Sequence, residues 1–131
     1  PPGDAVCEAD IAVLTLDQPV QGTRPLRLSD VATRRGDIGV AVGFGRTSND
    51  GGAGKKRARR GVEIVALSDH ELWVGEASCH GDSGGPLLDQ RGRLLGVLSR
   101  GGPGCSGAVQ NVYTRPQRFS ELIEAALLVP E

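Results

Sequence analysis

Short apolar runs separated by turn-forming residues occupy most of this chain. Residues 11–16 form a compact run, IAVLTL, which ends at Asp17-Gln18-Pro19 and predicts a buried strand. Glycines inside the run at residues 37–44 indicate a tight bend or bulge, and residues 48–54 form a turn-rich loop. Two runs flank the turn Gln90-Arg91-Gly92, which predicts a hairpin. The strands expected after residue 16 are residues 37–44, 61–67, 71–74, 86–89, 94–99 and 109–114.

The pattern changes after Pro116, where the apolar residues follow a helical period. The residues that share one helical face are Phe119, Leu122, Ile123, Ala126 and Leu127. Pro130 ends this helix. The chain also has 20 glycines among 131 residues, which disfavours a helical bundle because glycine is costly inside helices. The sequence therefore predicts an all-β domain followed by a C-terminal α-helix.

Composition limits the partners and cofactors to expect. The net charge of -1 gives no reason to expect nucleic acid or an anionic membrane as a partner. No apolar run is long enough for a transmembrane helix. The absence of a CxxC pair and the presence of only two histidines make a zinc site improbable, so we expect no metal and no cofactor. The basic run KKRARR at residues 55–60 predicts a solvated loop tip rather than a polyanion patch or a processing site.

The cysteines and the start of the chain are less decisive. Three cysteines, Cys7, Cys79 and Cys105, leave one without an intrachain partner, and spacing alone does not select the pair. No signal peptide is visible, and the chain opens with Pro-Pro-Gly-Asp. We therefore expect a fragment or a processed chain.

The segment most informative about chemistry is CHGDSGGPL at residues 79–87, which surrounds Ser83. Flanking glycines permit a sharp backbone turn, and such a turn can direct successive N–H groups toward one point. The N–H groups of Gly81 and Ser83 are placed to hold the oxyanion of a tetrahedral intermediate. The same Gly-x-Ser-x-Gly pattern occurs in α/β-hydrolases, where a helix and later a histidine follow the serine. Here Pro86 and a hairpin follow, and no histidine lies after Ser83, which disfavours that class.

The segment CHGDSGGPLL at residues 79–88 closely resembles the nucleophile segment of the trypsin/chymotrypsin-like serine proteases. Other segments resemble that family in the same order: residues 10–20, 42–47 (VGFGRT), 96–99 (GVLS) and 112–115 (VYTR). The resemblance covers about residues 8–128 and implies the family's second, six-stranded antiparallel β-barrel over residues 31–131. Residues 1–30 would then be a remnant of the first barrel and the linker. The short stretch at residues 67–78 is similar to bacterial members.

The resemblance also implies roles for single residues. Ser83 would be the nucleophile, Asp10 would orient a histidine, and the N–H groups of Gly81 and Ser83 would form the oxyanion hole. Asp82 would pair with an N-terminal ammonium produced by zymogen cleavage. The family's histidine precedes its aspartate, and neither His70 nor His80 matches it. We therefore expect the histidine in the missing N-terminal barrel, which would be this chain's partner, and we expect the chain alone to be inactive.

The specificity pocket follows from the same resemblance. Cys79 and Cys105 would pair across it, which suits an oxidising compartment and predicts a secreted protein, extracellular or periplasmic. Ala77 stands where members that cleave after Arg or Lys have an aspartate, so we expect a peptide or protein substrate with an uncharged side chain of small to medium size. Glu76, one position away, leaves a carboxylate in the pocket possible. The alternative function is a non-catalytic homologue that acts as a binding module. The expected pocket residues are Ala77, Ser78, His80, Ser99, Arg100, Gly101 and Asn111.

Overall fold

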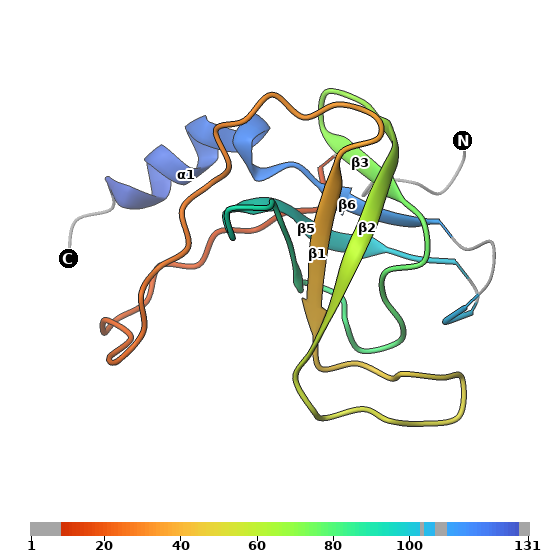
Figure 1. Cartoon of the computed structure of the whole chain (residues 1–131). Helices are drawn as coiled ribbons and strands as arrows, with labels where there is room; N and C mark the ends of the chain where they lie inside the picture. The colour runs from red at the N-terminus through yellow and green to blue at the C-terminus, as the bar shows by residue number, and fades with distance from the viewer. Residues whose placement is uncertain (1–8, 103, 107–109, 129–131) are drawn as a thin grey trace.

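A closed antiparallel β-barrel forms the centre of the molecule, as the computed structural model shows (Figure 1). The structure describes residues 9–102, 104–106 and 110–128, so Cys7 lies outside the described residues. The strand order around the barrel is β1-β2-β3-β6-β5-β4, which confirms the all-β, six-stranded prediction. The strands are β1 (Ile38–Gly43), β2 (Arg57–Leu67), β3 (Glu71–Val74), β4 (Pro86–Leu88), β5 (Leu94–Arg100) and β6 (Asn111–Thr114).

Alternate residues of the strands point into the barrel and form one apolar core. In β3, Leu72 and Val74 are fully buried while Trp73 between them is only half-buried, as a period of two requires. Burial of each such side chain stabilises the fold by about 1.5–3 kcal/mol. The other large members of the core are Val62, Ile64, Leu87, Leu95, Leu98 and Tyr113.

The β4–β5 hairpin is fixed by a buried aspartate. Asp89 Oδ1 accepts hydrogen bonds from the N–H groups of Arg91 and Arg93 at 2.8 and 2.9 Å. Ser29 Oγ donates to Asp89 Oδ2 at 2.6 Å, which ties the preceding linker to the barrel. Burial acts to raise the pKa of the Asp89 carboxyl, but these hydrogen bonds outweigh it and lower that pKa below its ordinary value.

The predicted strand at residues 11–16 is wrong. These residues are irregular, and the side chains of Leu14 and Leu16 are 81% and 59% exposed. A strand needs a neighbouring strand to receive its ladder hydrogen bonds, and no described strand lies alongside this segment. Further along, backbone hydrogen bonds of 2.9 Å from Ser29 N to Leu94 O and from Leu94 N to Arg27 O attach the segment to β5. The domain boundary expected at residue 30 stays a prediction.

The basic run also differs from the expectation of a loop tip. Residues 57–60 belong to β2, and residues 57–59 pair with β1 from Gly43 back to Ala41. Only Lys55 and Lys56 of the run lie outside the strand. All of these side chains remain exposed. The β1–β2 register shifts between Gly39 and Ala41, which agrees with the tight bend or bulge expected from the glycines of this strand.

A 3₁₀ turn, η1 (Pro116–Phe119), leads into the C-terminal helix α1 (Ser120–Leu127). Only part of the predicted apolar face packs, because Ile123 and Ala126 are half-buried whereas Leu122 and Leu127 are exposed. Within the described ranges, no helix is long and apolar enough to cross a bilayer.

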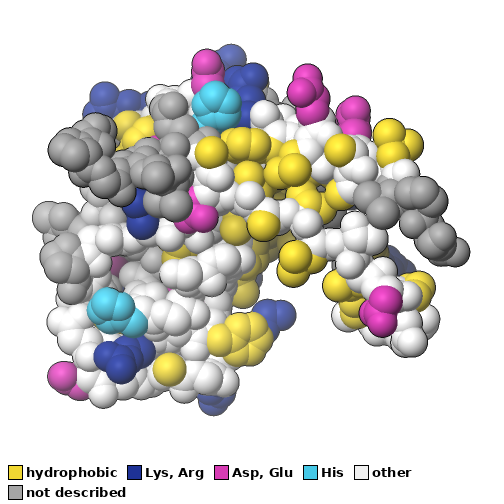
Figure 2. All heavy atoms as spheres, turned by 180° about the vertical axis from the view of Figure 1, so that it is seen from behind, with side chains coloured by type: hydrophobic (Ala, Val, Ile, Leu, Met, Phe, Trp, Pro, Cys, Tyr) yellow, Lys and Arg dark blue, Asp and Glu magenta, His cyan; other side chains and the backbone are white. Residues whose placement is uncertain are grey.

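Apolar side chains remain exposed along the N-terminal segment and on the helix. Figure 2 shows hydrophobic side chains gathered on one face of the molecule. The large exposed apolar residues of the N-terminal segment are Val13, Leu14, Leu16, Val20, Leu26, Leu28 and Val31.

Candidate active site

The loop between β3 and β4 exposes Ser83 on a tight turn. Gly81 and Gly84 have φ angles of +95° and +80°, which a side chain would strain. Hydrogen bonds from Asp82 N to Cys79 O at 3.1 Å and from Gly85 N to Asp82 O at 2.8 Å close the turn. Gly84 N donates to Leu98 O of β5 at 2.9 Å. These hydrogen bonds therefore hold the serine turn against β5 at the barrel surface.

A small pocket of about 160 Å³ opens beside Ser83. Gly81 and Ser83 both line it, and within the described part of the chain neither backbone N–H donates to another group. Both N–H groups therefore remain available as hydrogen-bond donors beside this pocket, and their role as an oxyanion hole stays a prediction. The other expected pocket residues that line it are Ser78, His80, Gly101 and Asn111.

Asp10 lies in a second, larger hollow of about 590 Å³, which Ser83 and Ser99 also line. Ser99 Oγ donates to Asp10 Oδ2 at 2.7 Å, and Thr114 Oγ1 donates to the Asp10 carbonyl at 3.0 Å. These two bonds fix both the side chain and the backbone of Asp10 against β5 and β6. The structure thus brings Asp10 and Ser83 to one open hollow, although they are far apart in sequence.

Asp82 points away from that hollow and is held by backbone amides. Its Oδ1 accepts from Gly45 N at 2.7 Å and its Oδ2 from Cys79 N at 2.9 Å. A Cβ atom on Gly43 would lie 1.9 Å from Asp82 Oδ1, so this carboxylate needs a glycine there. Burial, followed by the nearby Asp82 charge, raises the pKa of Tyr113. Sequence reasoning missed the contact between the Asp82 carboxylate and Gly45 N, although the Gly-Phe-Gly pattern at residues 43–45 was the available signal.

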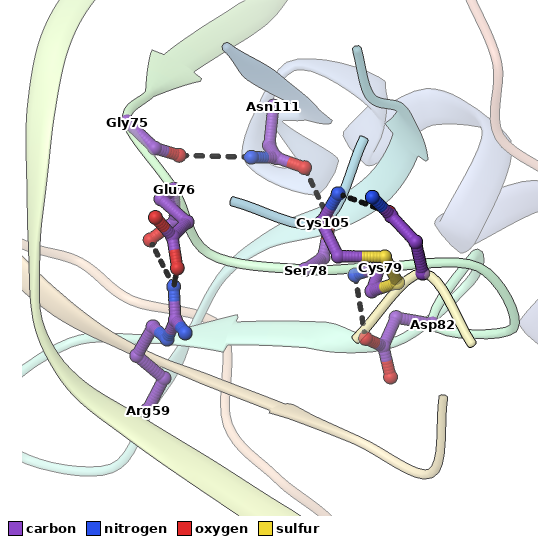
Figure 3. A network of polar contacts seen from close by, with 9 residues as sticks. Arg59, Gly75, Glu76, Ser78, Cys79, Asp82, Cys105 and Asn111 are labelled. Atoms are coloured by element: carbon purple, nitrogen blue, oxygen red, sulfur yellow. Dashed lines mark hydrogen bonds and ion pairs between the residues drawn. A yellow bond between two sulfur atoms is a disulfide. The ribbon is translucent and has the colours of Figure 1, made fainter. Parts of the chain in front are cut away.

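Asn111 and Ser78, which line the small pocket, belong to a network of polar contacts (Figure 3). Asn111, which is 2% exposed, donates through Nδ2 to Gly75 O at 2.9 Å and accepts a bond from Ser78 Oγ. A Cβ atom on Gly101 would lie 2.8 Å from Asn111 Oδ1. Asn111 therefore fills the space between the pocket walls.

Ala77 and Glu76 are not among the described residues that line the small pocket. Ala77 is buried and lines the hollow beside Asp82 rather than the small pocket. The Glu76 carboxylate contacts Arg59 Nη1 of β2 at 2.6 Å, as Figure 3 shows. Glu76 is not among the residues that line the small pocket. The described pocket lining therefore contains no carboxylate.

The disulfide expected from the resemblance is present between Cys79 and Cys105. Cys105 N also donates to Asn49 Oδ1 at 3.1 Å, which joins the disulfide to the β1–β2 loop. Of the remaining expected pocket residues, Ser99 faces Asp10, and Arg100 forms an ion pair with Glu71.

The two histidines occupy different places. The His70 ring lies 5.5 Å from the Phe119 ring and does not line the hollow that Asp10 and Ser83 share. His80 is exposed at the rim of the small pocket. Within the described ranges, no group of three or more metal-ligating side chains occurs.

Comparison with known proteins assigns the chain to a family. Residues 3–123 match the Trypsin family model. The chain therefore belongs to the trypsin family of serine proteases, as the sequence motifs, the disulfide and the barrel together indicate.

Curated relatives of the chain include animal proteases. Chymotrypsin-2 of Vespa crabro is 32% identical over 129 residues, which cover 88% of this chain and 56% of the relative. The Protein C activator of Agkistrodon piscivorus leucostoma is 26% identical over 144 residues, which cover 95% of this chain and 56% of the relative. The chain thus spans about half the length of the curated relatives it matches.

Solved structures show the same fold. Neuropsin, described as a serine protease expressed in the limbic system of mouse brain, matches with a TM-score of 0.69 and 24% identity. The match covers 79% of this chain and 54% of neuropsin. The expected similarity to bacterial members has no support, because these relatives are animal proteins.

Proposed function

We propose that this chain is part of a serine endopeptidase that hydrolyses peptide bonds through an acyl-enzyme on Ser83. The observation that carries the proposal is the shared hollow of Ser83 and Asp10, beside a pocket lined by Gly81 and Ser83. Ser83 Oγ attacks the scissile carbonyl, and the N–H groups of Gly81 and Ser83 hold the oxyanion. Each such donor contributes about 3–4 kcal/mol to catalysis.

In this proposal Asp10 orients a histidine supplied by a segment outside the chain. Asp10 Oδ2 accepts a hydrogen bond from the Ser99 hydroxyl. An aspartate held in this way can accept a hydrogen bond from the Nδ1–H of an imidazole and stabilise the charged form of that ring. His70 packs on Phe119 and His80 stands at the pocket rim, so neither serves as the base. The exposed apolar side chains at Leu14, Leu16 and Leu28 support a missing N-terminal barrel as the covering partner.

The substrate is a peptide or protein with an uncharged side chain of small to medium size before the scissile bond. Three features support this: the small pocket volume, the buried Asn111 between its walls, and the contact of Glu76 with Arg59. The Cys79–Cys105 disulfide supports an extracellular setting.

Peptide hydrolysis by two proteins tests the proposal. The whole protein, with the segment that precedes residue 1, should hydrolyse small neutral peptide substrates, and Ser83→Ala should abolish turnover. The 131-residue chain should show none, because without a base the serine hydroxyl keeps its proton. Ser83-dependent turnover by the chain alone would refute the assignment of the base to another segment. Failure of the whole protein to hydrolyse any peptide would instead favour the binding module.

A further inference from the structure

Glu71, the first residue of β3, carries a buried charge that the proposed reaction does not use. Its side chain is 2% exposed, and both carboxylate oxygens contact Arg100, from Nη1 to Oε1 at 2.6 Å and from Nη2 to Oε2 at 3.1 Å. A two-point contact of this kind fixes the direction of the guanidinium as well as its position. Arg100 therefore has little freedom to turn away from its neighbours.

The ion pair spans the strand that holds the Asp10 backbone. Glu71 pairs across the ladder with Thr114 of β6, and Arg100 pairs with Val112 of the same strand. The pair thus connects β3 to β5 across β6, and Thr114 is the residue whose hydroxyl binds the Asp10 carbonyl.

Arg100 also reaches the second group that holds Asp10. Its Nη1 lies 3.5 Å from Ser99 Oγ, and Ser99 Oγ donates to Asp10 Oδ2 at 2.7 Å. A guanidinium can only donate, whereas a hydroxyl has one hydrogen and two lone pairs. Ser99 therefore accepts from Arg100 and keeps its only hydrogen for Asp10. The order Glu71, Arg100, Ser99, Asp10 is one continuous polar chain.

We propose that Glu71 and Arg100 are positioning residues that orient the Asp10 carboxylate through Ser99. Neither lines the hollow that holds Ser83, so they act on the reaction only through Asp10. The inference rests on the proposed peptidase function. A purely structural ion pair that joins β3 to β5 is the competing explanation, and it would not require Ser99.

The test measures kcat and KM of the whole protein, with active sites counted by fluorophosphonate titration so that misfolded molecules are excluded. Glu71→Gln should lower kcat roughly tenfold and leave KM nearly unchanged, a smaller loss than the ~10²-fold cost of a 1 Å misplacement. In a Ser99→Ala background, Glu71→Gln should have no further effect on kcat, because the connection to Asp10 is already broken.

Two further variants keep the test decisive. Glu76→Gln removes a carboxylate that also contacts an arginine at 2.6 Å but is not part of the polar chain to Asp10, and it should leave kcat unchanged. If Glu71→Gln does not fold, Arg100→Lys provides the same comparison, since one ammonium cannot hold both Glu71 and Ser99 in the same geometry. Its kcat should fall in the wild-type background and not in the Ser99→Ala background.

The outcomes separate the two proposals. An active wild-type protein in which Glu71→Gln changes kcat by less than about twofold, or lowers it equally with and without Ser99, would overturn the positioning role alone. A wild-type protein without turnover would overturn the peptidase function, and the positioning role with it.

Discussion

Replacing Gly43 by alanine tests whether the buried side of the serine loop is built around the Asp82 carboxylate. The new Cβ atom would lie 1.9 Å from Asp82 Oδ1, which is far inside contact distance. Gly43 does not have a positive φ angle, so the backbone accepts alanine and the effect reports on space alone. The carboxylate must move, and it then loses the 2.7 Å hydrogen bond from Gly45 N.

The cost follows from that lost bond. A hydrogen bond to a charged group contributes about 1.5–3 kcal/mol, so Gly43→Ala should lower the free energy of unfolding by about 2 kcal/mol. Gly51→Ala is the matched control, because nothing lies within 4 Å of its added Cβ atom and its φ angle is not positive. Both variants gain the same small stabilisation from a stiffer unfolded chain, which cancels in the comparison.

Urea unfolding followed by the fluorescence of Trp73, the single tryptophan, measures this difference. In an Asp82→Ala background the cost of Gly43→Ala should vanish, because the added methyl group then has room. A difference between Gly43→Ala and Gly51→Ala below about 0.5 kcal/mol would refute the reasoning. So would a cost that persists unchanged without the Asp82 side chain.

Two further predictions concern pH and specificity. The folded-state pKa of Asp89 lies below its unfolded value of 3.8, so its contribution to stability is complete above that value and is lost as pH falls through the folded pKa. Urea midpoints should therefore fall more steeply with acid in wild type than in Asp89→Asn, and equal slopes would contradict this. In the whole protein, kcat/KM should be higher for substrates with Ala or Val before the scissile bond than for Arg or Lys. Glu76→Gln should not alter that order, and a strong preference for Arg would refute the uncharged pocket.

Much of the barrel could be predicted because its strands carry local signals. The strand expected at residues 71–74 and the hairpin expected around Gln90-Arg91-Gly92 both appear in the structure, as β3 and the β4–β5 hairpin. The run at residues 11–16 has the same local signal but stays irregular, because a strand also needs a neighbour. The basic run shows the opposite error: it was predicted to be a loop because it is charged, but residues 57–60 lie in β2 with their side chains exposed.

The candidate site, like the barrel, could be predicted only in part. The glycines around Ser83 and the resemblance at Asp10 named both residues, and the structure brings them to one hollow. The roles proposed for them remain predictions. The contact of Glu71 with Arg100 could not be predicted from the sequence. A charged residue in a strand is expected to face solvent, and Arg100 lies 29 positions away from Glu71.

The most direct test of the central claim is the site of a fluorophosphonate adduct in the whole protein. Mass spectrometry of the labelled protein should place the adduct on Ser83. Asp10→Asn should slow labelling strongly, because the histidine then loses its orienting carboxylate. An unlabelled protein, or an adduct on any residue other than Ser83, would contradict the proposal that Ser83 is the nucleophile of a serine endopeptidase.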